Sequence, residues 1–247
     1  MVWRQRLAVP CVLAGLAACA PFADMDLEEP SAESSRDGTL FNAANAIEDK
    51  WQHLQLVGAT RYTMTPFAGE VAILAQGEHS ASGLARRVSV DTTVCPEISW
   101  AWNVPQLQAS ADLTQRETED VAASIFLIFG DPGLFSDPRP VPTLRYVWTT
   151  DHLSAGTIVD SPYLEGTVKS LVIRTGTPET AEWLVERRNL VDDFTAAYGA
   201  APTDKIQAII LFTDNDQTKE PVMAYYGWAR VHCLVEGVSV EEEIGWE

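Results

Sequence analysis

Short segments of alternating or wholly apolar character recur along most of the chain, and glycine, proline and aspartate separate them. Alternation with a period of two residues is the pattern of a β-strand with one buried face. The predicted strands cover 61–67, 70–76, 82–91, 97–104, 121–130, 143–150, 167–175, 205–214 and 222–234. Strands this short, separated by turn residues, are typical of an antiparallel sandwich. The pattern therefore predicts a mainly β protein.

One segment has the period of a helix instead. Residues 177–179 supply an N-cap threonine, a proline at the first helical position and an acid in the first turn, and Gly199 supplies a stop. We expect one long packed helix at about 178–199, with Arg187 in the middle of its apolar stripe. An arginine there either keeps its guanidinium in water or is buried beside a carboxylate. The apolar residues at helical spacing are Trp183, Leu190, Val191, Phe194 and Tyr198.

The first residues of the chain have the order of a secretory signal. Arg4 and Arg6 precede an almost wholly apolar run, and the sequence Leu-Ala-Ala-Cys follows at once. The run of about twelve apolar residues is too short for the roughly 20 that a transmembrane helix needs. The Leu-Ala-Ala-Cys sequence resembles the lipobox of bacterial lipoproteins, in which a diacylglycerol is attached to the cysteine sulfur. We predict a signal peptide at 1–18 and lipid attachment to Cys19.

The predicted mature chain has two parts. Residues 19–39 are rich in Glu, Asp, Ser, Pro and Ala, a composition typical of a flexible tether. Residues 40–247 hold the predicted sandwich as one domain. Ala20 follows the cysteine, and by resemblance to Gram-negative sorting patterns this favours the outer membrane. We therefore expect a protein of the bacterial cell envelope, lipid-anchored at the outer membrane or on the periplasmic side.

The charge of the chain excludes one class of partner. Lys and Arg number 17 against 35 Asp and Glu, and the formal net charge is -18. Such a surface repels nucleic acid and anionic lipid head groups. We expect no nucleic-acid partner, and we assign the membrane contact to the lipid anchor alone.

Two of the four cysteines remain in the predicted domain. Cys11 lies in the predicted signal and Cys19 is the predicted lipid site, which leaves Cys95 and Cys233. In an oxidising compartment two such thiols either form a disulfide or stay as separate buried thiols. The chain has no Cys-x-x-Cys and no close pair of histidines, so a zinc site has no support.

Two aromatic pairs lie on predicted strands. Trp100 and Trp102 stand two residues apart, as do Tyr146 and Trp148, so each pair points to one face of a sheet. On an open face these rings would form a platform for stacking sugar rings. On an inner face they would fill the core, because aromatic side chains dominate core burial. The pattern leaves both interpretations open.

An acidic run follows the apolar strand at 206–212. Asp214, Asn215 and Asp216 crowd oxygen-bearing side chains at the strand end, and oxygen ligands suit calcium, the one cofactor that the chain suggests. The pattern of an EF-hand is absent. The alternatives are an Asx turn, in which these side chains bond their own backbone, and direct contact with a ligand.

Carboxylates also raise the question of catalysis. Asp112, Glu119 and Asp120 precede the predicted strand at 121–130, and one of them with Asp214 or Asp216 could form the acid and nucleophile of a glycosidase. That chemistry needs two carboxyl groups about 5 to 9 Å apart across a cleft. Gly-x-Ser-x-Gly does not occur, so a serine nucleophile of that type has no support.

Several stretches, taken in their order, resemble the DUF3047 family, a bacterial group named as a domain of unknown function. The family carries an arginine in the strand after the acidic pair, where this chain has Ser124. The resemblance implies a jelly-roll sandwich of the kind found in carbohydrate-binding modules, and it brings no established activity. The stretches are 80–84 (SASGL), 98–102 (ISWAW), 119–129 (from ED), 144–148 (LRYVW), 183 with 186–194 (ERRNLVDDF), 213–218 (TDNDQT) and 224–227 (AYYG).

The sequence thus favours a lipid-anchored β-sandwich that binds a glycan or another envelope component without chemistry. The alternatives are a calcium-stabilised polysaccharide-degrading enzyme and a structural lipoprotein that binds a protein partner. Arg187 is expected in a charge network beside the binding face. The residues predicted for that face are Trp100, Trp102, Tyr146, Trp148, Asp214 and Asp216.

Overall fold

The computed structural model of the chain describes residues 37–44, 51–134 and 137–234. The predicted signal peptide and Cys19 lie outside these residues, as does the predicted tether up to residue 36. Residues 37–39 already belong to the first strand, β1 (Asp37–Asn42), so the folded domain begins before residue 40. Within the described part, no helix is both long enough and apolar enough to cross a membrane.

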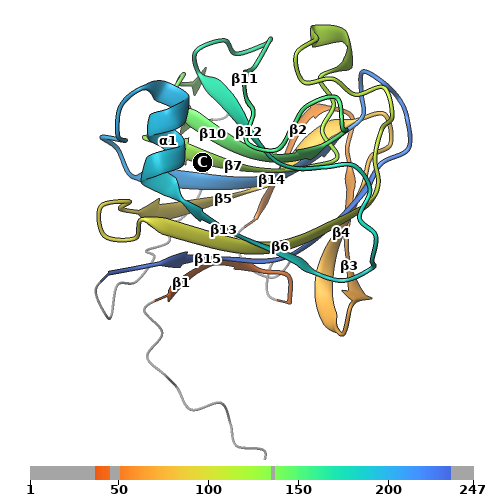
Figure 1. Ribbon diagram of the computed structural model, residues 1–247, viewed down its shortest axis with the longest axis horizontal. Helices are drawn as coiled ribbons and strands as arrows, with labels where there is room; N and C mark the ends of the chain where they lie inside the picture. The colour runs from red at the N-terminus through yellow and green to blue at the C-terminus, as the bar shows by residue number, and fades with distance from the viewer. Residues whose placement is uncertain (1–36, 45–50, 135–136, 235–247) are drawn as a thin grey trace, which may run out of the picture. The chain divides into compact units, whose positions relative to one another are not determined.

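Two sheets form the two layers of a sandwich (Figure 1). In the six-stranded sheet the order is β13-β6-β15-β4-β3, and β1 pairs with residues 228–232 of β15, beyond the part that pairs with β4. Its other strands are β13 (Leu184–Asn189), β6 (Glu97–Gln106), β15 (Met223–His232), β4 (Glu70–Gln76) and β3 (Arg61–Phe67).

The seven-stranded sheet has the order β11-β12-β10-β7-β14-β5-β2. Its strands pair antiparallel except β10 and β12, which run parallel. Its strands are β11 (Ile158–Asp160), β12 (Val168–Thr175), β10 (Thr143–Thr149), β7 (Ala123–Phe129), β14 (Ile206–Asp214), β5 (Ala81–Val90) and β2 (Gln52–Val57). Smaller elements are the pair β8 (Gly133–Leu134) and β9 (Asp137–Pro138) and the 3-10 turn η1 (Arg116–Thr118).

The prediction of a mainly β sandwich with one packed helix is confirmed. Every strand predicted from the pattern is present, with ends shifted by about two residues at most. The pattern missed β1, β2, β11, β13 and the pair of β8 and β9.

The helix is shorter than predicted. α1 spans Leu190–Tyr198, and the residues before it form β13 along β6. Asn189 is the N-cap, because its side-chain oxygen accepts the N–H groups of Val191 and Asp192 at 3.0 Å each. Gly199 ends the helix with φ 82°, as its position predicted. The cap-like signal at 177–179 was overridden, since pairing with β6 satisfies the backbone of 184–189.

The core lies between the inner faces of the two sheets, and α1 lies at one end of it beside β10 and β13 (Figure 1). Phe194 of α1 packs on Phe129 with ring centroids 4.4 Å apart. The hydroxyl of Tyr198 donates to the carbonyl oxygens of Thr143 and Thr167, each at 2.8 Å. These contacts join α1 to the ends of β7, β10 and β12.

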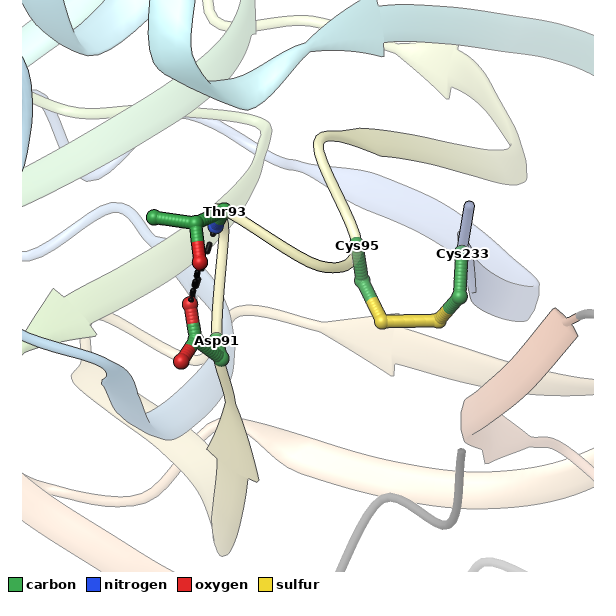
Figure 2. The surroundings of a disulfide bond; sticks show 4 residues. All are labelled: Asp91, Thr93, Cys95 and Cys233. Carbon is green, nitrogen blue, oxygen red and sulfur yellow. Dashed lines mark hydrogen bonds between the residues drawn. A yellow bond between two sulfur atoms is a disulfide. The ribbon is translucent and has the colours of Figure 1, made fainter. Parts of the chain in front are cut away.

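Cys95 and Cys233 form a disulfide, one of the two outcomes that the sequence allowed (Figure 2). The bond connects the turn before β6 to the residue after β15. Asp91 shapes that turn, because its Oδ1 accepts the N–H of Thr93 at 2.9 Å and the Thr93 hydroxyl at 2.6 Å (Figure 2).

The outer face of the seven-stranded sheet is covered over only part of its area. Val147 alternates with the core residues Tyr146 and Trp148, so it points outward from the sandwich. There it belongs to a second apolar cluster formed with the segments that precede β7 and follow β10. The buried members of that cluster are Leu113, Val121, Val147 and Val172. The neighbouring part of this face is the site described next.

Candidate functional site

A groove of about 460 Å³ lies on the outer face of the seven-stranded sheet. Its size is within the range of about 300 to 1,000 Å³ that is common for small-molecule sites. Most of its lining is apolar, and its polar groups gather around the end of β14. The lining residues are Leu54, Leu56, Val57, Ala81, Glu119, Phe126, Arg145, Ser161, Tyr163, Leu164, Val168, Ile210, Phe212, Asp214, Asp216 and Gln217.

The floor of the groove comes from the two central strands. Ile125 and Leu127 on β7 point into the core, so Phe126 between them points to the groove. Ile210 lies opposite Phe126 in the register of β14. Phe212 follows on the same face, and its ring meets Phe126 edge to face at 5.5 Å. Both faces of these strands are apolar because one face fills the core and the other lines the groove.

Gly83 lets this floor continue across β5. It lies opposite Phe212 on one side and Leu54 on the other. A Cβ at this position would stand 2.7 Å from side-chain carbons of Ile210 and Phe212, which is closer than real contacts allow. The absence of a side chain therefore lets Ile210 and Phe212 lie across β5 toward β2.

The mouth of the groove is apolar on both sides. Leu56 and Val57 stand on β2, and Tyr163 and Leu164 stand in the loop between β11 and β12. Their exposed fractions are 67%, 47%, 44% and 55%. Among the described residues these four make up half of the eight exposed large apolar side chains. Apolar groups gathered in this way mark a binding surface, whereas scattered ones do not.

A buried ion pair stands at the polar end. Arg145 of β10 is 4% exposed, and its side chain donates to Glu119 and, at 2.8 Å, to the hydroxyl of Ser170. Its guanidinium also lies 5.4 Å from the centroid of the Phe126 ring. The positive charge of Arg145 is therefore already matched by Glu119.

Three more carboxylates meet beside this pair. Asp120, Asp214 and Asp216 each place an oxygen within 4.8 Å of the other two. We call these three residues the carboxylate cluster. Asp214 ends β14 and Asp216 follows it, while Asp120 comes from the segment before β7. The cluster thus joins two parts of the chain that are far apart in sequence.

The three carboxylates differ in how their oxygens are used. Asp120 accepts the N–H groups of Gln217 and Thr218 at 3.2 and 2.7 Å and so holds the loop after β14. Asp214 accepts the N–H of Val121 at 2.7 Å. Asp216 accepts the side-chain amide of Gln217 with Oδ2, but its Oδ1 is buried and has no hydrogen-bond partner in the described chain.

The environment favours the protonated form of two of these groups. Burial raises the pKa of Asp214 well above its usual value, the charge of Asp120 raises it further, and Arg145 opposes the rise. The pKa of Asp216 is also raised, first by burial and then by Asp120. A cation beside these two carboxylates would favour their ionised forms and so oppose both effects.

The structure changes the set of residues predicted to bind a metal. Asp214 and Asp216 lie together as predicted, but Asn215 does not join them. Its Oδ1 accepts the N–H of Ser80 at 3.0 Å, and its Nδ2 donates to the carbonyl of Glu220 at 2.9 Å. Asn215 therefore joins the loop after β14 to the segment before β5, and these two bonds are not those of an Asx turn. Asp120 is the third carboxylate that could meet a cation.

The predicted aromatic platform lies in the core instead. Trp100, Trp102 and Tyr146 are 0% exposed and Trp148 is 1% exposed. Trp100 stacks on Tyr146 at 4.9 Å, and Trp102 meets Trp148 edge to face at 5.6 Å. Each pair does point to one face of its strand, but that face is the inner one. The rings of β6 and β10 form the contact between the two sheets.

Arg187 also lies away from the groove. It stands on β13, in the six-stranded sheet, with its side chain 61% exposed and paired with Glu97. The charge pair near α1 involves its neighbour Arg188, whose side chain is 39% exposed, and the buried Asp193, which also accepts the Tyr146 hydroxyl at 2.9 Å. The prediction that Arg187 lies on a helix is wrong, because this segment is a strand.

A family model described as "Protein of unknown function (DUF3047)" matches residues 49–229, a range that contains the whole groove. No curated protein matches the chain. Among solved structures, the family 11 xylanase from Neocallimastix patriciarum is similar over 75% of this chain and 97% of its own, at 10% identity with a TM-score of 0.27. A likeness this low carries no inference about activity.

Proposed function

Because the chain belongs to the DUF3047 family, whose function is not established, we propose a function from the groove itself. The protein is a non-catalytic binding module that holds an amphiphilic component of the cell envelope. The apolar part of the ligand lies on Phe126, Ile210 and Phe212, and its polar head lies at the carboxylate cluster.

The apolar mouth is the observation that carries this proposal. Leu56, Val57, Tyr163 and Leu164 expose carbon surface on both sides of a groove whose floor is also apolar. Covering such surface releases water and contributes about 25 cal/mol per Å². An amphiphile covers the floor and the mouth together while its head stays at the polar end.

The groove supports an amphiphile better than a glycan. A sugar ring binds by stacking on an open aromatic face, with hydrogen bonds to its hydroxyl groups. The four rings predicted for that role are buried, and the groove walls are mainly aliphatic. The prediction of a glycan ligand therefore loses the open aromatic platform that supported it.

The carboxylates give less support to a glycosidase. Glu119 is paired with Arg145, and Asp120 holds backbone N–H groups of the loop after β14. Asp214 and Asp216 remain, and they lie together at one end of the groove. A glycosidase needs its two carboxyl groups on opposite sides of the bond that it cleaves.

The predicted anchor suits this function. A lipid on Cys19 would hold the module at a membrane surface, where amphiphiles of the envelope are found. The location and the anchor are part of the proposal, as is the ligand class.

A neutral apolar dye tests the groove. The chain without its predicted signal, with Cys19→Ser so that no attached lipid competes, is titrated with N-phenyl-1-naphthylamine, whose fluorescence rises in apolar surroundings. We expect saturable binding of one dye. Leu56→Asp and Leu164→Asp should each weaken it at least tenfold, because a charge enters the apolar mouth.

Val185→Asp is the matched control. Val185 is 54% exposed on β13 of the other sheet, so this variant adds the same charge away from the groove and should bind the dye normally. Equal effects of Leu56→Asp and Val185→Asp would show that the dye binds elsewhere and would remove the support for the proposed function.

A further inference from the structure

We propose that the groove selects amphiphiles with a cationic head group, such as an amine, over those with a neutral or an anionic head. This inference rests on the proposed function and adds the chemistry of the head group. It is carried by the charges, the hydrogen bonding and the position of the groups at the polar end.

The position of the carboxylates places the head next to the floor. Ile210, Phe212 and Asp214 alternate along β14, so all three side chains lie on one face. Successive residues on one face of a strand are about 7 Å apart along it. An apolar chain lying over Phe126 and Phe212 therefore ends beside Asp214.

The charges at this end favour a cation. Four carboxylates, those of Glu119 and the carboxylate cluster, stand near one guanidinium, that of Arg145. The guanidinium of Arg145 already donates to Glu119 and Ser170. The net charge of these four carboxylates and one guanidinium is negative. A carboxylate or phosphate head would meet like charge in a partly desolvated place, which costs free energy.

The hydrogen bonding at this end lacks donors. The backbone supplies N–H groups to Asp120 and Asp214, but Oδ1 of Asp216 is buried without a partner in the described chain. An alkylammonium group brings three N–H donors and a positive charge. It satisfies the unpaired oxygen and offsets the repulsion between Asp214, Asp216 and Asp120. A hydroxyl head supplies one donor and no charge.

Three ligands with the same apolar chain test the head group. n-Octylamine, n-octanol and n-octanoate are titrated by calorimetry into the chain that carries Cys19→Ser. Octylamine should bind at least tenfold more tightly than octanol, and octanoate should bind more weakly than octanol.

Asp216→Asn tests whether the preference for a cationic head group comes from the carboxylate cluster. The amide keeps the shape of the side chain and removes its charge, so octylamine should lose at least tenfold in affinity while octanol keeps its own. Glu70→Gln is the matched control, because Glu70 is exposed on β4 in the other sheet and should affect neither ligand.

The outcomes separate this inference from the proposed function. Equal affinities for all three ligands, each lowered by Leu56→Asp, would overturn the head-group preference. They would still support binding in the groove. Tighter binding of octanoate would overturn it as well. Calcium chloride that binds through Asp216 while octylamine does not would make the cluster a metal site and overturn the preference. If Leu56→Asp leaves the affinities for octanol and octylamine unchanged, the proposal that these ligands bind in the groove is overturned.

Discussion

Single residues decide the chemistry of the groove, and Asp214 is the clearest case. It ends the central strand β14 and is 6% exposed, yet it bears a carboxyl group beside Asp120. Asp214 accepts a hydrogen bond from the N–H of Val121, and this bond needs an oxygen but not a charge. The unfavourable part of the arrangement is therefore the negative charge.

Asp214→Asn should remove that cost and keep the bond to Val121. Because the folded-state pKa of Asp214 lies above its unfolded value, stability falls as pH rises from the unfolded pKa through the folded pKa. The melting temperatures of variant and natural chain should differ least near pH 4, close to the unfolded pKa of Asp. As pH rises to 9, the melting temperature of the variant should increasingly exceed that of the natural chain. A variant that is less stable at every pH would show that the anion stabilises the fold.

The sequence predicted some of these residues and missed others for a physical reason. Asp214 and Asp216 were found because they follow a strand. Asp120 was named only as a possible catalytic acid, since the fold alone brings it to the strand end. The face of Trp100 and Trp102 could not be decided, because alternation shows which residues share a face but not which face is covered.

At the scale of elements, the segment from β13 to α1 shows where local signals fail. Its strand carries Glu186, Arg187 and Arg188 in succession, which hides the alternation of a strand. The ladder with β6 is a non-local contact that no local pattern records. By contrast, β3 alternates and β4 is a short apolar run, and both were predicted to their ends.

Asn189 fixes the boundary between strand and helix. Asn189→Ala removes the acceptor for two N–H groups at the start of α1 and should lower the free energy of unfolding by about 1 kcal/mol. For a chain of this size that equals roughly 2 to 4 °C in melting temperature. Asn189→Asp keeps an acceptor and is the control. An alanine variant as stable as the natural chain would show that pairing with β6 alone sets the boundary.

At the scale of the whole molecule, the disulfide constrains most of the domain. Cys95 and Cys233 are 138 residues apart in the chain, and their bond closes a loop that contains both central strands. A loop of this length should stabilise the fold by about 4 kcal/mol by limiting the unfolded chain. Sequence alone found the pair by elimination but could not show that the two residues meet.

Replacing both cysteines by serine should lower the free energy of unfolding by about 4 kcal/mol. For a domain of this size this corresponds to a fall of roughly 10 °C in melting temperature. Urea unfolding followed by tryptophan fluorescence and by circular dichroism should show the same loss. The comparison is made with Cys19→Ser in both proteins. A melting temperature unchanged within about 2 °C would mean that the unfolded chain is already compact without the bond.

The order of the strands has a consequence for how the chain matures. β14 separates β5 from β7, and β15 separates β6 from β4, so the centres of both sheets come from the last part of the chain. A chain that emerges from its N-terminus holds the neighbouring strands with open edges until residues 206–232 arrive. Neither layer can close during synthesis. We therefore expect both sheets to be completed only after the chain has been made through residue 232, so that folding of the sandwich follows synthesis.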